Sequence, residues 1–232
     1  MDAVVMAAGE GTRLRPLTER WPKPVLPIDG RPVVATLLRE LARAELRRVW
    51  LVTGHFAAQV EALVGGGTAF GLELQFVRQP DVLGSADAVQ RALAAGATAP
   101  VIVSAADTVF GPGDLARFVK TFSTSGASGA VAVRRDPPPG PGRQAIRRSG
   151  DRVVRIGDDD PTNPWSGAPL WALGAAVAER LCHDRPPYEL ENAFREALEA
   201  GETVIAVEIG KTRDLTYPLD LVKENFPYLR AT

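Results

Sequence analysis

The sequence predicts an α/β fold, a Rossmann-like three-layer sandwich built on a mostly parallel β-sheet. Short apolar runs that are typical of buried strands alternate with amphipathic, helix-like segments through the first half of the chain. The connections between them are short, so right-handed crossovers should place the strands side by side and parallel. The chain has 232 residues, 45% of them hydrophobic, which is enough for one sizeable core.

The predicted strands of the first half lie at residues 3–7, 48–53, 72–77 and 101–104. The predicted helices lie between them, at 33–44, 57–64 and 85–94, with apolar residues three and four positions apart. In such a sheet, ligands bind beyond the carboxyl ends of the strands. Residues that directly follow a predicted strand are therefore the first candidates for a functional site.

The second half of the chain is less regular. Strands are predicted at 129–133, 170–173 and 203–209, and a hairpin at 146–156 that turns at Ser149-Gly150. Helices are predicted at 175–182 and 189–200, and from about Leu219 onward. The Pro- and Gly-rich stretch 136–142 is predicted to be a loop, as is the acidic run 158–160, which we expect to be solvated. No linker divides the chain, so we predict a single domain over residues 1–232.

The composition argues against several classes of partner. The net charge is −1 at pH 7, and the basic residues are scattered, so nothing favours nucleic acid or an anionic membrane surface. Cys182 is the only cysteine, which excludes an internal disulfide and is typical of a reducing compartment. No apolar stretch approaches the length of a membrane span, and the chain begins with a predicted strand. We therefore expect a cytoplasmic protein that is either a monomer or a homo-oligomer.

Two glycines, Gly9 and Gly11, directly follow the first predicted strand. Glycine allows positive φ and a close approach of the backbone to a ligand, and consecutive N–H groups in such a turn bind anions. Arg13 offers a planar fork of donors that matches phosphate oxygens, and Lys23 adds a point charge. The spacing differs from the Walker A loop, and Leu14 stands where a dinucleotide fingerprint has its third glycine. The alternative is a structural turn flanked by two solvated cations.

Polar residues also follow the third and fourth predicted strands. The amide of Gln79 can pair with the edge of a base, and Gly84 would let a flat base approach the backbone. Ser85 begins a predicted helix and can serve as its cap, a role compatible with binding a base. Asp107 follows the fourth strand, where a carboxylate would point into the ligand crevice; its alternative role is a helix cap or turn residue.

These motifs resemble the signature of the sugar-1-phosphate nucleotidyltransferases, the NDP-sugar pyrophosphorylases, in a short single-domain form. The resemblance implies a fold of the nucleotide-diphospho-sugar transferase type, with a nucleotide-binding half at 1–110 and an acceptor-binding half at 111–232. It implies catalytic roles for Arg13 and Lys23. The residues that it assigns to nucleotide binding are Ala8, Gly9, Gly11, Thr12, Gln79, Gly84 and Ser85.

The resemblance also implies a Mg²⁺ cofactor. Asp107 matches a metal ligand of the family, and the segment 213–221 resembles the family's Asp-x-Gly-Thr/Arg-Pro-x-Asp-Leu motif. That match places Asp214 on the second metal ligand, although Thr216 stands where the family usually has glycine. Glu208 is the rival ligand, and Asp220 is predicted to cap the last helix.

The acceptor side departs from the family pattern. The family often has Glu-Lys-Pro after a Val-x-x-Ile strand, whereas here residues 157–161 read Gly-Asp-Asp-Asp-Pro and the lysine is missing. Gly167 keeps its place in the family's Asn-x-Gly motif, and Glu189 begins a stretch that resembles the family's Glu-Leu-Thr-Asp helix start. Both residues are candidates for acceptor binding.

The resemblance implies the reaction of a nucleoside triphosphate, UTP or dTTP, with a sugar 1-phosphate to give an NDP-sugar and pyrophosphate, a step of nucleotide-sugar biosynthesis. One alternative is a CTP-dependent cytidylyltransferase for phosphocholine or another small phosphate, which the altered residues 158–167 favour. The other is a catalytically silent, nucleotide-binding regulatory subunit. The retention of Arg13, Lys23, Asp107 and Asp214 argues against the silent subunit.

Overall fold

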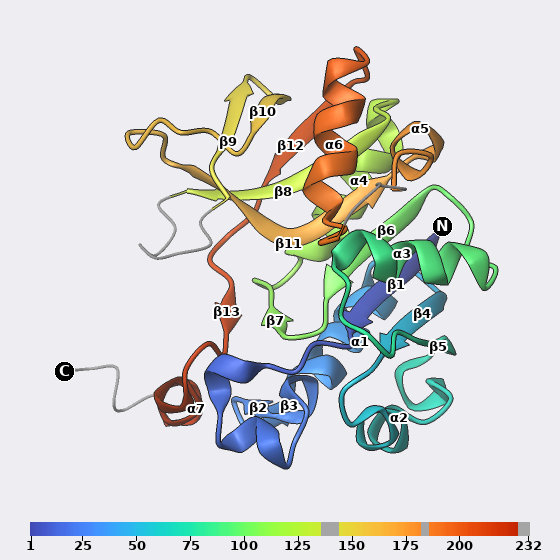
Figure 1. Cartoon of the computed structure of the whole chain (residues 1–232), viewed down its shortest axis with the longest axis vertical. Helices are drawn as coiled ribbons and strands as arrows, with labels where there is room; N and C mark the ends of the chain where they lie inside the picture. The colour runs from blue at the N-terminus through green and yellow to red at the C-terminus, as the bar shows by residue number, and fades with distance from the viewer. Residues whose placement is uncertain (136–143, 182–185, 227–232) are drawn as a thin grey trace.

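The computed structural model describes residues 1–135, 144–181 and 186–226. Its centre is a nine-stranded sheet with the strand order β5-β4-β1-β6-β11-β8-β12-β10-β9 (Figure 1). These strands are β1 (Asp2–Ala7), β4 (Arg48–Thr53), β5 (Glu73–Arg78), β6 (Val101–Ala105), β8 (Gly129–Arg135), β9 (Ile146–Ser149), β10 (Arg152–Ile156), β11 (Trp165–Leu173) and β12 (Val204–Glu208).

The direction of the strands confirms the mostly parallel sheet that the sequence predicts. β1 pairs in parallel with β4 and β6, β4 with β5, and β8 with β12. β11 is antiparallel to its neighbours β6 and β8, and β10 is antiparallel to β12 and β9. All the strands of this sheet except β10 and β11 therefore run in one direction. The carboxyl ends of β1, β6 and β8 consequently lie at the same edge.

Helices cover both faces of the sheet, because alternate residues of each strand point to opposite sides. Val5 and Leu51 belong to an apolar cluster with α1, α2 and α4, whereas Val4 and Val52 belong to a second cluster with α3, α5 and α6. Figure 1 shows α3 and α6 in front of the sheet. The helices are α1 (Val33–Arg43), α2 (Ala57–Val64), α3 (Ser85–Ala94), α4 (Asp114–Ser125), α5 (Ala175–Ala178), α6 (Leu190–Glu199) and α7 (Pro218–Asn225).

Two small sheets lie beside the large one: a local hairpin, and a pair of strands that are far apart in the sequence. β2 (Pro27–Ile28) pairs with β3 (Arg31–Pro32), and β7 (Thr108–Val109) pairs with β13 (Arg213–Asp214). A third apolar cluster of Leu14, Leu26, Ile28, Val33 and Leu215 packs the segment after β1 against the segment after β13. Figure 1 shows α7 close to β2 and β3. The segments that carry the predicted site residues after β1 and in β13 therefore pack against one another.

The main difference from the sequence prediction is α4, which was not predicted. Leu115, Phe118 and Phe122 have helical spacing and are buried, but the Gly-Pro-Gly run 111–113 just before them indicates a loop. The strand predicted at 170–173 is the second part of the longer β11. Asp220 caps α7 as predicted, because it accepts from the Thr216 and Tyr217 N–H groups at 3.0 Å and 2.7 Å. The predicted loop 136–142 and Cys182 lie outside the described residues.

Candidate active site

The loop that follows β1 turns at Gly11, which has φ 63° and ψ 40°. A side chain there would be strained, and its Cβ would lie 3.0 Å from Thr18 Cγ2. Thr18 Oγ1 and the Leu14 N–H both donate to the Gly11 carbonyl at 2.9 Å. Gly9 does not adopt a positive φ, so Gly11 is the glycine that shapes the turn.

Gly54 and His55 support this loop, and the sequence predicts no role for them. They directly follow β4, and the His55 N–H donates to the Ala8 carbonyl at 3.1 Å. His55 Nε2 lies 2.9 Å from the Thr18 carbonyl and so acts as a donor. A Cβ at Gly54 would lie 2.9 Å from the Ala8 carbonyl oxygen, which only a glycine avoids. The sequence signal for this supporting role is a Gly-His pair that directly follows a predicted strand.

A cavity of about 290 Å³ opens between this loop and the end of β6. It brings together Arg13, Lys23 and Asp107, as their positions in the predicted fold require. Its lining comes from the glycine loop, from the last residues of β1 and β6, and from the segment around Lys23. The lining residues are Met6, Ala7, Gly9, Gly11, Thr12, Arg13, Lys23, Pro24, Ala105 and Asp107.

Lys23 and Asp107 form an ion pair inside this cavity. Lys23 Nζ lies 2.5 Å from Asp107 Oδ2, and the two side chains are 13% and 30% exposed. The other carboxylate oxygen, Oδ1, accepts from Thr108 Oγ1 at 3.3 Å. The carboxylate is therefore oriented by two partners while it still faces the cavity.

Asp214 comes near Asp107 in the backbone through the pairing of β13 with β7, but it is not among the residues that line the charged cavity. In the antiparallel register Asp214 is opposite Thr108, the residue that follows Asp107. Asp214 is exposed, and its Oδ2 accepts from Thr216 Oγ1 at 3.2 Å. The rival Glu208 ends β12, with its Oε2 4.0 Å from Arg148 Nη1.

This donor set suits Mg²⁺, which takes one or two carboxylates together with substrate phosphates and water. In the part of the chain that the structure describes, no group of three or more His, Cys, Asp or Glu side chains is arranged so that it could hold a metal ion. A cation held by Asp107 and Asp214 would therefore complete its coordination with oxygens from the substrates.

Gln79, Gly84 and Ser85 lie together at the start of α3. Gln79 is buried, and its Nε2 donates to the Gly84 carbonyl at 3.0 Å and to Asp87 Oδ2 at 2.8 Å. Gly84 has φ 125°, and a Cβ there would overlap the Tyr188 carbonyl. The glycine is thus required by the approach of residue 188, a contact that the sequence alone does not indicate.

Ser85 and Glu189 bind each other across the two helices α3 and α6. The Ser85 N–H donates to Glu189 Oε2 at 3.3 Å, and its hydroxyl donates to the same oxygen. The Leu190 N–H donates to Ser85 Oγ at 2.9 Å. Ser85 therefore stabilises the start of α6, whereas the cap of α3 that the sequence predicts is not formed.

The acidic run 158–160 is only partly solvated, contrary to the prediction. Asp158 is buried, and its Oδ1 lies 2.8 Å from Arg147 Nη2 while its Oδ2 accepts from Asn163 Nδ2 at 2.8 Å. Burial raises the pKa of Asp158, but the hydrogen bonds from Arg147 and Asn163 outweigh it and leave the pKa lowered. A charged network around the buried Asp158 thus anchors the β9–β10 hairpin. Gly167, on β11, donates its N–H to the Gln144 carbonyl at 2.8 Å.

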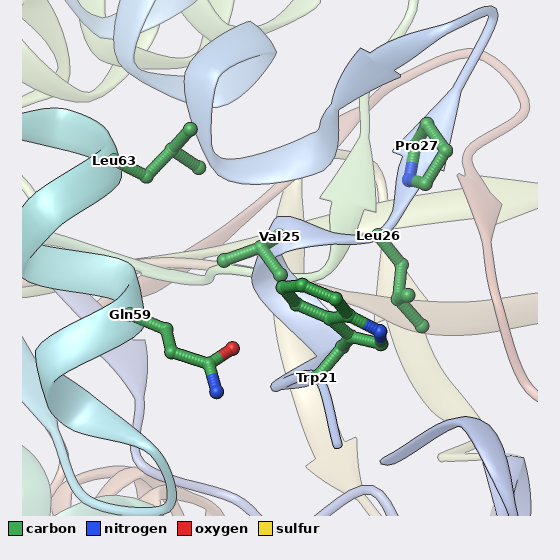
Figure 2. A pocket seen from close by; sticks show the side chains of 6 residues that line it. All are labelled: Trp21, Val25, Leu26, Pro27, Gln59 and Leu63. Carbon is green, nitrogen blue, oxygen red and sulfur yellow. The ribbon is translucent and has the colours of Figure 1, made fainter.

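A second cavity of about 400 Å³ lies between α2 and the segment that follows Lys23 (Figure 2). Its walls are almost entirely apolar and include no ionisable side chain. Gln59 Nε2 donates to the Arg20 carbonyl at 3.0 Å. The catalytic chemistry is therefore assigned to the smaller, charged cavity. The lining residues of the larger one are Trp21, Val25, Leu26, Pro27, Gln59 and Leu63.

The geometry agrees with comparisons to known proteins. A model of the nucleotidyl transferase family matches residues 2–144. The chain is similar to a mannose-1-phosphate guanylyltransferase of Mycobacterium tuberculosis, 29% identical over 235 residues that cover 100% of the chain and 65% of that protein. It is also similar to the bifunctional protein GlmU of Acidovorax sp., 36% identical over 168 residues that cover 70% of the chain and 34% of GlmU.

Among solved structures, the chain is similar to an inositol-1-phosphate CTP transferase from T. maritima. The TM-score is 0.80 at 20% sequence identity, with 94% of this chain and 90% of the other chain covered, so the likeness concerns the fold. The chain spans 65% of the length of the guanylyltransferase and 34% of that of GlmU. No helix within the described ranges is long and apolar enough to cross a membrane.

Proposed function

Because the chain belongs to the nucleotidyl transferase family, we propose that it joins a nucleoside triphosphate to a sugar 1-phosphate and releases pyrophosphate. The observation that carries this proposal is the cavity in which a glycine turn, Arg13, Lys23 and Asp107 meet at the carboxyl edge of the sheet. The similarity to a mannose-1-phosphate guanylyltransferase over the whole chain supports the same class of reaction.

The glycine loop would hold the leaving pyrophosphate. Backbone N–H groups from Ala8 to Thr12 can donate to phosphate oxygens, and the rigid turn at Gly11 keeps them oriented. The Arg13 guanidinium lies at the same wall of the cavity and would bind the β- and γ-phosphates through its planar fork. These groups would stabilise the negative charge that develops on the leaving group.

Lys23 would neutralise the α-phosphate or the incoming phosphate, because it lines the cavity and its ammonium group lies beside Asp107. Asp107 and Asp214 would hold Mg²⁺, which supplies positive charge to the phosphate oxygens when it is bound. The acceptor phosphate is itself a competent nucleophile, so no general base is required. The work of the chain is positioning and charge neutralisation.

Gln79, Gly84 and Ser85 would contact the nucleobase, and Gly167 and Glu189 would lie on the acceptor side. UTP or dTTP is the proposed nucleotide, although the relatives include an enzyme named for guanylyl transfer. The near-neutral net charge and the single cysteine support a cytoplasmic enzyme without nucleic-acid or membrane partners.

The test is a matrix of nucleotides and acceptors, read by pyrophosphate release with Mg²⁺ or with a chelator. The nucleotides are UTP, dTTP, GTP and CTP, and the acceptors are glucose, mannose and inositol 1-phosphates and phosphocholine. We expect Mg²⁺-dependent release with a sugar 1-phosphate. Release with CTP and phosphocholine alone would establish the cytidylyltransferase alternative. Nucleotide binding without release from any pair would establish the silent subunit.

A further inference from the structure

The turn between β2 and β3 is bound by a residue next to Asp214. The turn residues Asp29 and Gly30 have φ 52° and 69°, as in a tight type I′ hairpin turn. Arg213 Nη2 donates to Asp29 Oδ1 at 2.8 Å and Nη1 donates to Oδ2 at 2.5 Å, which is a bidentate pair. Arg213 Nε also donates to Glu224 Oε2 at 2.5 Å. One guanidinium therefore joins β13, the β2–β3 turn and α7.

Asn225 strengthens this connection from the end of α7. Its Nδ2 donates to the Pro27 carbonyl at 2.8 Å, and its Oδ1 accepts from the Gly30 N–H at 2.8 Å. The Asp29 N–H also donates to the Glu224 carbonyl at 3.3 Å. We call Arg213, Glu224 and Asn225, together with the Asp29-Gly30 turn, the C-terminal clasp.

The clasp completes a series of contacts that begins at the charged cavity. Lys23 lies a few residues before β2, and its ammonium group pairs with Asp107. Asp107 precedes β7, which pairs with β13 and so with Arg213 and Asp214. Arg213 then connects β13 to the β2–β3 turn through its pair with Asp29. Successive side chains of a strand point to opposite sides. Arg213 can therefore bind the β2–β3 turn on one side of β13 while Asp214 points to the other side.

β13 needs such support because its pairing with β7 is very short. The two strands pair only through Arg213–Val109 and Asp214–Thr108. A two-stranded ribbon of this length is marginal without further contacts. Arg213 is 28% exposed and Glu224 is 19% exposed, so the guanidinium contacts are partly shielded from water.

We propose that Arg213 is a positioning residue that holds Asp214 beside Asp107 and thereby sets the affinity of the site for a divalent cation. This inference rests on the proposed function, since it concerns the metal ligands of that reaction. Residues that orient metal ligands from outside the coordination sphere typically change metal affinity about 10- to 100-fold when they are replaced. The effect should therefore appear in metal binding itself and not only in turnover.

The test uses the full chain with Arg213→Met, Asp29→Asn and the conservative Arg213→Lys. Mn²⁺ binding is measured by electron paramagnetic resonance, and the half-saturating Mg²⁺ concentration by pyrophosphate release. We expect the first two variants to raise both constants about tenfold or more, and Arg213→Lys to raise them less. Asp29→Asn alters the clasp without touching β13, so it also guards against a folding defect of the Arg213 variants.

The matched control is Arg48→Met. Arg48 also makes a bidentate pair, with Asp2 at 3.0 Å and 2.8 Å, but at the beginnings of β4 and β1 and therefore at the opposite edge of the sheet. We expect this variant to lower Tm while both metal constants stay within about twofold of wild type. Equal changes in Arg48→Met and Arg213→Met would reduce the clasp to a general stability element and overturn the inference.

The outcomes separate this inference from the proposed reaction. If wild type releases pyrophosphate but Arg213→Met and Asp29→Asn leave both metal constants unchanged, the reaction stands and the positioning role fails. If wild type binds Mn²⁺ without turnover, the reaction fails and the Mn²⁺ constants alone decide the role of Arg213. A wild-type chain that binds no Mn²⁺ overturns the role of Arg213 outright.

Discussion

The ion pair between Lys23 and Asp107 would compete with a divalent cation bound at the proposed metal site. Lys23 Nζ lies 2.5 Å from Asp107 Oδ2, an oxygen that would have to coordinate the cation. Since an ammonium group and Mg²⁺ are both attracted to the same carboxylate, each weakens the hold of the other. Lys23 is thus placed to release Asp107 when phosphates arrive and attract its charge.

This competition predicts opposite effects of Lys23→Met on metal binding and on turnover. We expect turnover to fall about 100-fold or more, because a cation at the reacting phosphates is lost. We expect Mn²⁺ binding to the free protein to become several-fold tighter, because Asp107 no longer has a competing partner. Weaker Mn²⁺ binding in Lys23→Met would contradict the competition.

The proposed metal ligand Asp107 is tested separately. Asp107→Asn should abolish turnover and weaken Mn²⁺ binding while nucleotide binding persists.

The charged part of the site was predictable from the sequence, whereas its supports were not. Arg13 and Asp107 follow soon after strands β1 and β6, so the parallel sheet brings them to one edge, whereas Lys23 reaches the cavity through the longer segment after β1. The contact of Tyr188 with Gly84 joins segments more than a hundred residues apart and leaves no local pattern. The pairing of Arg213 with Asp29 is hidden for the same reason.

The loop before β11 is anchored to the β9–β10 hairpin by one buried carboxylate. Asp158 binds Arg147 of β9 and Asn163, and Asn163 Nδ2 also donates to the Ile146 carbonyl at 3.1 Å. The lowered pKa of Asp158 means that the folded state favours the charged carboxylate. The ionised network therefore stabilises the β9–β10 hairpin and the loop before β11.

The stabilisation from Asp158 should depend on pH in a defined direction. Because its pKa is lower in the folded than in the unfolded chain, the contribution is complete above the unfolded pKa of about 3.9 and is lost as pH falls through the folded pKa. We expect Asp158→Asn to reduce the free energy of unfolding at pH 7, and this effect to shrink progressively as the pH falls below about 3.9, measured by urea denaturation.

Asp159→Asn is the matched control for this prediction. Its side chain is 91% exposed and makes only a surface pair with Arg155 at 3.2 Å, so the free energy of unfolding should change little at either pH. An effect of Asp158→Asn that is as large at pH 3 as at pH 7 would show that the carboxylate charge is not the cause.

The elements of the fold were predicted to different degrees for physical reasons. Strands β1, β4 and β6 are buried on both sides and therefore read as continuous apolar runs. The helix α4 escaped prediction because Gly111 and Gly113 precede it, although its buried residues have helical spacing. The first part of β11 reads as a loop because Gly167 and Pro169 interrupt it, yet its pairing with β8 extends it back to Trp165.

The two halves of the chain, residues 1–110 and 111–232, share one sheet and the first two apolar clusters. β11 in the second half pairs with β6 in the first half through Leu170–Ser104 and Leu173–Val101. The first cluster joins residues of α1 with residues of α4, and the second joins residues of α3 with residues of α6. If one half unfolded alone, the apolar residues of the other half that belong to these clusters would become exposed to water, which is unfavourable.

We therefore expect the whole chain to unfold in one cooperative transition, as a single domain over residues 1–232 requires. Trp50 lies within residues 1–110 and Trp171 within residues 111–232, and both are 8% exposed, so each can report on its own part of the shared core. In two variants that each keep only one of these tryptophans, with the other three of the chain replaced by Phe, the fluorescence midpoint in urea should coincide with the midpoint from far-ultraviolet circular dichroism of the same variant. The calorimetric and van't Hoff enthalpies of wild type should also agree. Separate midpoints would mean that residues 1–110 and 111–232 unfold independently, and the sheet pairing between β6 and β11 would then be too weak to couple them.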